Sequence, residues 1–126
     1  MEKTITIDGK PITFKVTGGT LYRYKQQFGT EFLADAASLM DIENTKKTKK
    51  VKQPDGKFTF KVEYDYTKLN LELVYNLAWT MAKTADPSIP DPQAWLDSFD
   101  TFPIEKVAEP LMNMLQKSIE MSTKNG

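Results

Sequence analysis

The sequence predicts an α+β protein: a mainly helical domain with a small antiparallel sheet beside its core. Three observations predict this class. Residues 3–16 alternate between apolar and polar side chains around Asp8-Gly9, as an N-terminal β-hairpin does. Residues 69–83 are apolar around almost their whole circumference, which is typical of a buried central helix. Alternation over residues 48–63 predicts a second, lysine-rich hairpin, and we expect the two hairpins to form one sheet.

Composition sets the size of the domain and excludes several kinds of site. The 126 residues suit one domain, and 17 basic side chains balance 17 acidic ones, so no net charge attracts nucleic acid or an anionic membrane. The chain has no cysteine and no histidine. Disulfides and thiolate metal sites are therefore excluded, and the commonest general base is missing. The first nine residues contain no apolar segment like that of a secretory signal, so we expect a soluble cytoplasmic protein.

The N-terminal hairpin has one apolar face that a helix must cover, because an isolated hairpin is marginally stable. That face contains Ile5, Ile7, Ile12, Phe14 and Val16. Two amphipathic helices are expected next. Thr20 is a suitable N-cap for the first, which should end at Gly29. Thr30 is a suitable cap for the second, which is expected from Glu31 to Met40.

The second hairpin is expected to pair residues 48–53 with residues 57–63, around a turn at Gln53-Pro54-Asp55-Gly56. Five lysines lie within residues 46–52. They are consistent with a nucleic-acid-binding surface or with a solvated strand edge. We favour the edge, because lysines protect exposed strand edges and because this segment has no arginine for bidentate contacts with bases.

The central helix is expected to begin after a cap at Asp65 or Thr67 and to end near Thr84. Three prolines follow closely: Pro87, Pro90 and Pro92. Proline restricts the backbone, so this linker should be stiff and extended. Asp91 is the expected N-cap of a short helix over residues 92–98. This helix presents Trp95, Leu96 and Phe99.

The last segment, residues 104–121, has two neighbouring apolar strips at helical spacing. The first strip contains Val107, Leu111, Met114 and Met121, and the second contains Ala108, Met112, Leu115 and Ile119. Pro110 either kinks this helix or marks the start of another near Glu109. We expect one strip to pack on the central helix and the other to meet a partner helix; the alternative is that both belong to the core. The candidate partner-binding residues are Met112, Leu115, Ile119 and Met121.

A search for catalytic residues finds no nucleophile with a base beside it in the pattern that catalysis needs. Four acidic residues surround the proline linker: Asp86, Asp91, Asp97 and Asp100. Their spacing matches no calcium loop, and we favour capping and turn roles over a Mg²⁺ or Ca²⁺ site. Gly18-Gly19 lacks the pattern of a phosphate-binding loop. We therefore expect no enzymatic activity, no metal and no cofactor.

Residues 77–102, LAWTMAKTADPSIPDPQAWLDSFDTF, resemble a signature of the tail assembly chaperones of long-tailed (siphovirus-type) phages and prophages of Gram-positive bacteria. The shared features are a hydrophobic helix ending at residues 78–83, the proline linker, and the sequence WLDSF at residues 95–99. The residues that carry the motif are Trp79, Trp95, Leu96, Asp97 and Phe99. The opening ITIDGKPITFKV and the pair Phe28-Gly29 are similar to the N-terminus of the family. Residues 44–61 look like an inserted hairpin within a single domain of residues 1–126.

The resemblance implies that the chain binds the tape measure protein and keeps it soluble in the host bacterial cytoplasm while the tail tube assembles. It implies absence from the mature virion, and a longer form of the protein made by programmed frameshifting. The implied partners are the tape measure protein, that longer form and further copies of the chain, but no membrane. One alternative is a structural tail component, which would be found in purified particles. Another is a small nucleic-acid-binding module that uses Lys46–Lys57, although we favour no nucleic-acid partner.

Overall fold

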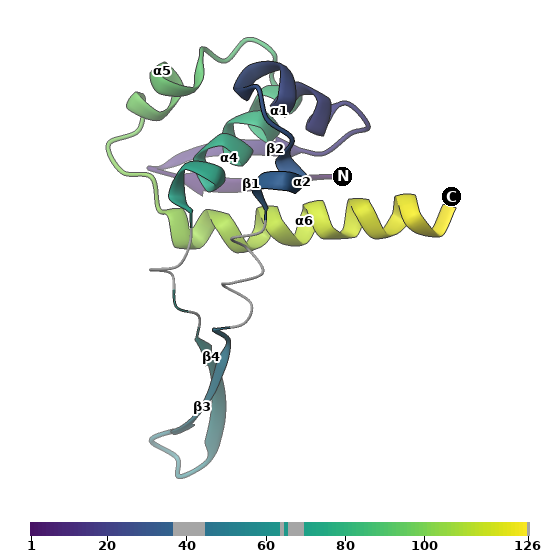
Figure 1. Cartoon of the computed structure of the whole chain (residues 1–126). Coiled ribbons are helices and arrows are strands. Elements are labelled where there is room, and N and C mark those ends of the chain that lie inside the picture. Colours follow the sequence, from purple (N-terminus) through teal and green to yellow (C-terminus); the bar gives the residue numbers. More distant parts are fainter. Residues whose placement is uncertain (37–44, 64, 66–69, 126) are drawn as a thin grey trace. The chain divides into compact units, whose positions relative to one another are not determined.

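The computed structural model describes residues 1–36, 45–63, 65 and 70–125, with the side chains of residues 121–125 left out (Figure 1). It has the α+β class that the sequence predicts. The chain forms two compact units. The first joins Met1–Phe32 to Leu71–Gly126, and the second is Leu33–Asn70.

The first unit opens with an antiparallel hairpin, β1 (Glu2–Ile7) and β2 (Lys10–Lys15). Asp8 and Gly9 connect the strands with φ angles of 53° and 75°, which suits a two-residue turn. The side chain of Phe14 is fully buried. Helix α4 packs against β2, so the apolar face of the hairpin is covered by a helix as expected.

Helix α1 (Thr20–Phe28) ends where the sequence predicts, at Gly29, whose φ of 77° is readily adopted by glycine. Its predicted N-cap is wrong. The cap position is Gly19, and Thr20 is the first helical residue. The hydroxyl of Thr20 is buried and accepts a hydrogen bond from the Thr17 N–H at 2.8 Å, so it closes the preceding turn instead of capping the helix.

The next predicted helix is described only in part. Helix α2 covers Phe32–Asp35, and the remainder of the prediction to Met40 falls largely outside the described residues. Phe32 is buried and its ring lies edge-on to that of Tyr24, with centroids 5.3 Å apart. The start of α2 therefore packs against α1.

Helix α4 (Leu71–Ala85) is the central helix of the first unit, as predicted, and it packs against β2, α1, α5 and α6. Its buried side chains include Thr80, which donates a hydrogen bond to the carbonyl of Asn76 at 2.7 Å. That bond satisfies a hydroxyl that water cannot reach. Asp65 does not cap α4, because the helix begins at Leu71; Thr67 lies outside the described residues.

Two helices complete the first unit. Asp91 caps α5 (Pro92–Asp97) by accepting from the Ala94 N–H at 2.8 Å, as predicted. Helix α6 (Ile104–Asn125) runs through Pro110 as one element, so no new helix begins near Glu109. None of the described helices is both long and apolar enough to span a bilayer.

The second unit contains the lysine-rich hairpin, β3 (Lys47–Lys52) and β4 (Phe58–Glu63), close to its predicted bounds. Its turn includes Gly56 at a φ of 84°, and Asp55 accepts from the Lys57 N–H at 2.9 Å. The two hairpins do not join in one sheet. Within the described chain each forms its own two-stranded sheet, because each strand pairs only with its neighbour across a tight turn.

Candidate functional site

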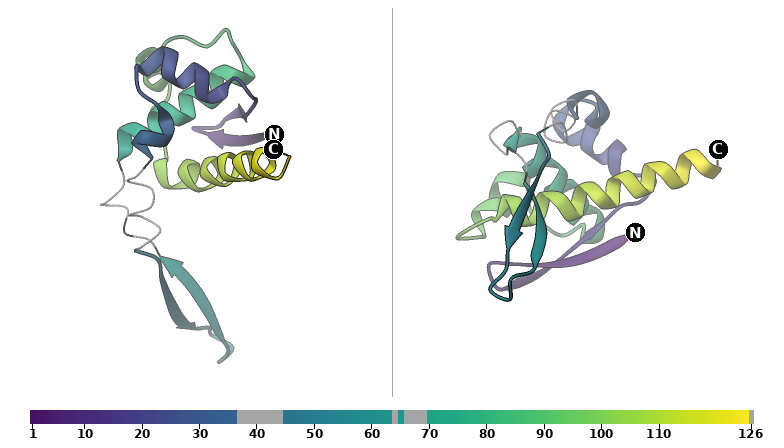
Figure 2. Two further views of the ribbon diagram at one scale, coloured as in Figure 1. Left: turned by 45° about the vertical axis from the view of Figure 1, so that its right-hand side comes forward. Right: turned by 90° about the horizontal axis from the view of Figure 1, so that it is seen from below.

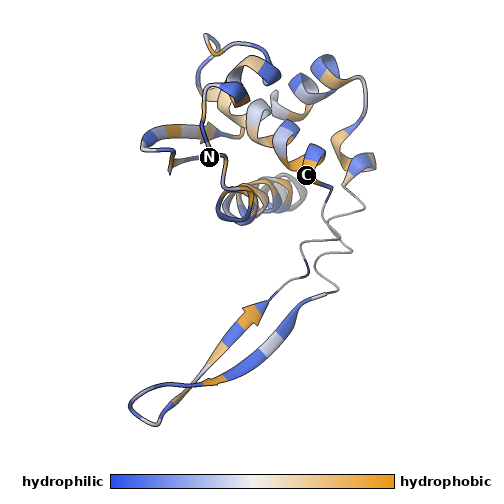
Figure 3. Ribbon diagram, turned by 90° about the vertical axis from the view of Figure 1, so that its left-hand side faces the viewer, coloured by the Kyte–Doolittle hydropathy of each residue, from blue (hydrophilic) through white to orange (hydrophobic). Residues whose placement is uncertain are grey.

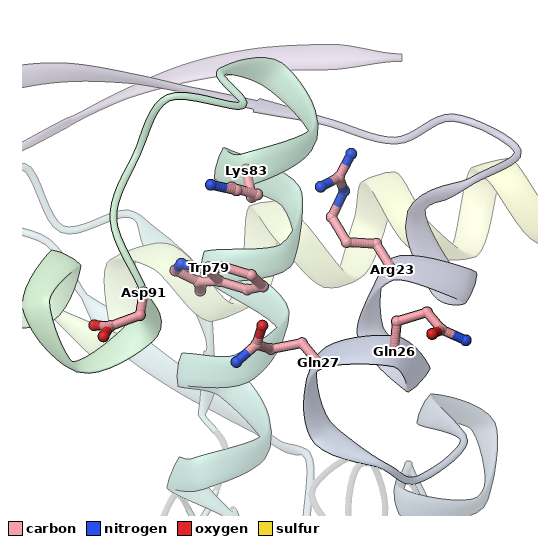
Figure 4. Close-up of a pocket in the computed structure, with 6 residues that line it drawn as sticks. All are labelled: Arg23, Gln26, Gln27, Trp79, Lys83 and Asp91. Carbon is pink, nitrogen blue, oxygen red and sulfur yellow. The ribbon is translucent and has the colours of Figure 1, made fainter.

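The motif region begins on α4, where Trp79 and Lys83 lie one turn apart on one face of the helix (Figure 4). The indole Nε1 of Trp79 donates to the carbonyl of Pro90 at 2.9 Å. The ammonium of Lys83 donates to the carbonyl of Ile89 at 2.7 Å. Two adjacent linker carbonyls are thus bound by two side chains of α4, Trp79 of the motif and Lys83 one turn later. These bonds fix the path of the proline linker and so the position at which α5 begins.

The remaining aromatic motif residues form a cluster around α5. The rings of Trp95 and Phe99 are 5.2 Å apart and nearly perpendicular. Phe102 lies 5.8 Å from each of these rings and 5.6 Å from that of Tyr75 on α4. Such edge-to-face contacts add about 0.5–1.5 kcal/mol per pair beyond burial. The motif therefore ties α5 and the turn after it to the central helix.

The turn of the first hairpin reaches the end of α5. Lys10 donates to the carbonyl of Ser98 at 2.9 Å, and its ammonium lies 5.4 Å from the centre of the Phe99 ring. The carboxylate of Asp8 accepts from the Asp100 N–H at 3.0 Å. These contacts join residues that are 88 and 92 positions apart in the chain. They anchor the motif region to the sheet as well as to α4.

Three of the four linker aspartates have hydrogen-bonding roles through their side chains. Asp91 caps α5, and Asp97 accepts from Gln93 at 3.1 Å. Asp86 accepts from both the hydroxyl and the N–H of Ser88, and these bonds hold its pKa below the ordinary value of an aspartate. Among the described residues, no group of three or more acidic side chains is arranged to hold a metal ion.

A hollow of about 360 Å³ lies between α1, α4 and the linker (Figure 4). It is lined by Arg23, Gln26, Gln27, Trp79, Lys83 and Asp91. The polar groups of Trp79, Lys83 and Asp91 are bonded to the linker and to α5. These three groups therefore have structural roles. The rest of the lining comes from the three long polar side chains of α1.

The predicted partner-binding residues on α6 differ sharply in burial. Leu115 is only 3% exposed and belongs to the core, whereas Met112 is half-buried and Ile119 is 40% exposed. The side chain of Met121 lies outside the described residues. Val107, Leu111 and Met114 of the first strip and Ala108 of the second also belong to the core. Among the described side chains the first strip is therefore buried, whereas the second strip is buried at Ala108 and Leu115 but partly exposed at Met112 and Ile119.

A second hollow, of about 350 Å³, lies between α6 and the edge strand β1. Its apolar lining comes from Met1, Pro110 and Met114, and Asn113 and Lys117 contribute polar atoms. At 3.6 residues per turn, Asn113 and Lys117 lie well away from Met112 and Ile119 around the helix. Helix α6 therefore has a hollow on one flank and partly exposed apolar side chains on the other.

Sequence reasoning identified the motif residues but missed the groups that hold them. Lys83 and Lys10 were not singled out, although each donates to a carbonyl of the motif region. A lysine at the end of an apolar helix, four residues after a buried tryptophan, is a weak signal for such a contact. Nothing in the sequence near Lys10 indicates its contact with Ser98.

Comparisons with protein-family models, with curated proteins and with solved structures gave no match.

Proposed function

We propose that this chain is a phage tail assembly chaperone that binds the tape measure protein and keeps it soluble during tail tube assembly. The motif in residues 77–102 supports this function by resemblance. The observation that carries it is on α6, where the apolar pattern continues beyond the core. Leu115 is buried, but Ile119, one turn later, exposes 40% of its surface. In Figures 1 and 2 the C-terminal part of α6 extends past α4.

An apolar helical surface suits a long helical client. A tape measure protein presents long apolar stripes that aggregate when they are left uncovered. An amphipathic helix recognises such a stripe through side chains spaced by one or two turns. Met112 and Ile119 are seven residues apart, about 10 Å along the helix and on the same side. Methionine adapts its shape to different neighbours, which suits a client whose stripe varies along its length.

In this proposal the family motif builds the frame and does not touch the client. Trp79 is 3% exposed and is bonded to the linker, and Trp95 packs in the aromatic cluster. Both side chains are already used within the fold. Their role is to hold α5 and α4 together so that α6 is presented from a rigid unit.

The same proposal sets the other partners and the place of action. The chain acts in the host bacterial cytoplasm, together with a longer frameshifted form and further copies of itself, and it leaves before the virion is complete. A structural tail component would instead remain in the particle. Mass spectrometry of purified particles separates the two: the chaperone should be absent, and a tail component should be present in many copies.

Co-expression tests the binding directly. The tape-measure-like reading frame that this proposal expects downstream of the gene is expressed with and without this chain, and soluble protein is analysed by size exclusion. The proposal predicts a tape measure that is soluble only with the chain and that elutes with several copies of it. If the tape measure stays insoluble with both the short and the longer form, the proposal fails.

A further inference from the structure

One face of the lysine-rich hairpin is apolar and exposed. Its register places Phe58, Phe60 and Val62 on the same side of β4, since alternate residues of a strand share a face. They are 51%, 70% and 46% exposed. Figure 3 shows the resulting alternation of hydrophobic and hydrophilic residues along the strand. Two exposed phenylalanine rings on one face are unusual, because removing apolar surface from water is favourable. Such a patch is typical of a surface that binds a partner.

Lysines share this face with the rings. Lys52 lies directly opposite Phe58, and Lys50 lies opposite Phe60, so their side chains project to the same side. The ammonium of Lys50 is 4.1 Å from the centre of the Phe58 ring, within the range of a cation–π contact. The face therefore alternates aromatic surface with positive charge.

The charge of the hairpin is strongly positive although the whole chain is neutral. Residues 45–63 contain seven lysines and two acidic residues, a net charge of +5, so the rest of the chain carries −5. Both acidic residues have partners within the hairpin. The carboxylate of Asp55 accepts a hydrogen bond in the turn, and the carboxylate of Glu63 lies 3.7 Å from the ammonium of Lys61. The net charge of the whole chain is zero because the basic hairpin is balanced by acidic residues elsewhere. A neutral chain therefore does not exclude an anionic partner for the hairpin.

We propose that this face binds single-stranded nucleic acid without sequence preference. Bases stack on Phe58 and Phe60, and the ammonium groups of Lys50 and Lys52 neutralise the neighbouring phosphates. The two rings are two residues apart on one strand, about 7 Å, so they can receive successive bases of an extended strand. The absence of arginine from the hairpin argues against reading of base edges but not against stacking.

Other occupants fit these observations less well. A second hairpin would bring its own charge of +5 against the first, and like charges oppose that pairing. Insertion into an anionic bilayer would bury Lys50 and Lys52 together with the rings they accompany, which is costly for charged groups. A single strand instead offers flat apolar surface and negative charge in alternation. This inference concerns the second unit and does not rest on the function proposed for α6.

The test measures fluorescence anisotropy of a labelled oligothymidine of about 12 nucleotides, titrated with the full chain at about 50 mM salt. Binding is expected to weaken as salt rises, with a log–log slope of about −0.7 for each phosphate neutralised. Replacing both lysines, Lys50→Gln and Lys52→Gln, should reduce that slope by about 1.4. The matched control, Lys106→Gln with Lys117→Gln on α6, removes the same charge from the first unit and should leave the slope unchanged.

The rings are tested by shape-matched substitutions. Phe60→Leu keeps an apolar side chain but removes the stacking surface, and it should weaken binding about tenfold. Phe60→Trp retains a ring and strand propensity, so binding should persist and the oligonucleotide should quench a part of the tryptophan fluorescence. Tyr22→Leu, on an aromatic side chain of α1 that is 68% exposed, is the control and should bind normally.

Several results would overturn the inference. One is no binding by the unaltered chain at low salt. Another is equal binding by the Phe60→Leu and unaltered proteins, or an unquenched Phe60→Trp protein, because each would show that no base stacks there. Salt-sensitive binding to phosphatidylserine vesicles, to an acidic peptide or to a second copy, with none to the oligonucleotide, would assign the face to that partner instead.

Discussion

Truncation of Trp79 tests whether the motif is a structural frame. The side chain is 3% exposed, its ring lies 5.8 Å from that of Phe28, and its Nε1 donates to Pro90 at 2.9 Å. Emptying a buried tryptophan site costs about 3–5 kcal/mol. A domain of this size is stable by about 5–15 kcal/mol, so Trp79→Ala should remove a large share of the free energy of unfolding.

A second substitution separates packing from the hydrogen bond. Trp79→Phe retains a ring but leaves the carbonyl of Pro90 without its donor, so we expect a loss of about 1–3 kcal/mol. The control is Tyr22→Ala on α1, an exposed aromatic side chain whose removal should change stability by less than about 0.5 kcal/mol.

Urea denaturation followed by far-UV circular dichroism measures all three variants. The expected order of stability is Tyr22→Ala, then Trp79→Phe, then Trp79→Ala, and the dependence on urea should be similar for each. A loss of less than about 1 kcal/mol in Trp79→Ala would contradict a structural role for this side chain, because removing a buried, hydrogen-bonded indole costs more than that. If Trp79→Ala lost client binding at unchanged stability, Trp79 would belong to the binding surface and not to the structural frame.

Three more substitutions around the linker have defined outcomes. Asp91→Ala removes the cap of α5 and should cost about 1 kcal/mol in the urea assay, whereas Asp91→Asn keeps an acceptor and should cost little; equal stabilities would contradict the capping role. Lys83→Met keeps the aliphatic stem but removes the donor to Ile89, so a loss of about 1–3 kcal/mol is expected, and none would show that the bond is dispensable. Ser88→Ala removes the hydroxyl that contributes most to the lowered pKa of Asp86, so NMR titration should show that pKa rising part of the way to its ordinary value. Because the pKa is lowered in the folded state, the stabilisation is present above the ordinary value and is lost as pH falls through the lowered one.

Local signals predicted the elements well. The hairpins follow from a period of two, and α4 follows from an apolar pattern around its whole circumference. The end of α1 at Gly29 and the cap of α5 at Asp91 follow from residue types that favour those backbone positions. Each of these features depends on neighbours within a few residues, which a sequence displays directly.

Features that depend on distant partners were predicted less well. The two strips of α6 look equivalent in the sequence, yet within the second strip Leu115 is buried while Met112 and Ile119 are partly exposed. The 15 residues of α4 span about 22 Å and the 22 residues of α6 about 33 Å. A longer helix packed on a shorter one must leave part of its apolar surface uncovered, and only the packing shows which part.

The contacts that hold the motif region could not be predicted from the sequence either, because they also depend on residues far apart in the chain. Periodicity shows that Trp79 faces inward, but it does not show that the indole reaches the carbonyl of Pro90. The bonds from Lys10 to Ser98 and from Asp100 to Asp8 join opposite ends of the chain. Such pairs form because the fold brings them together, and neither partner carries a local signal for the other.

The most direct test of tape measure binding by α6 is co-elution of the tape measure protein with two variants of this helix. Ile119→Asp places a charge on the exposed apolar surface, and Asn113→Asp places the same charge on the other flank of the helix, where the side chain is already exposed and polar. Both proteins should stay folded by circular dichroism. We predict that Ile119→Asp loses the tape measure from the size-exclusion peak while Asn113→Asp retains it. Equal co-elution of both folded variants would contradict the claim that the exposed apolar surface at Ile119 binds the client.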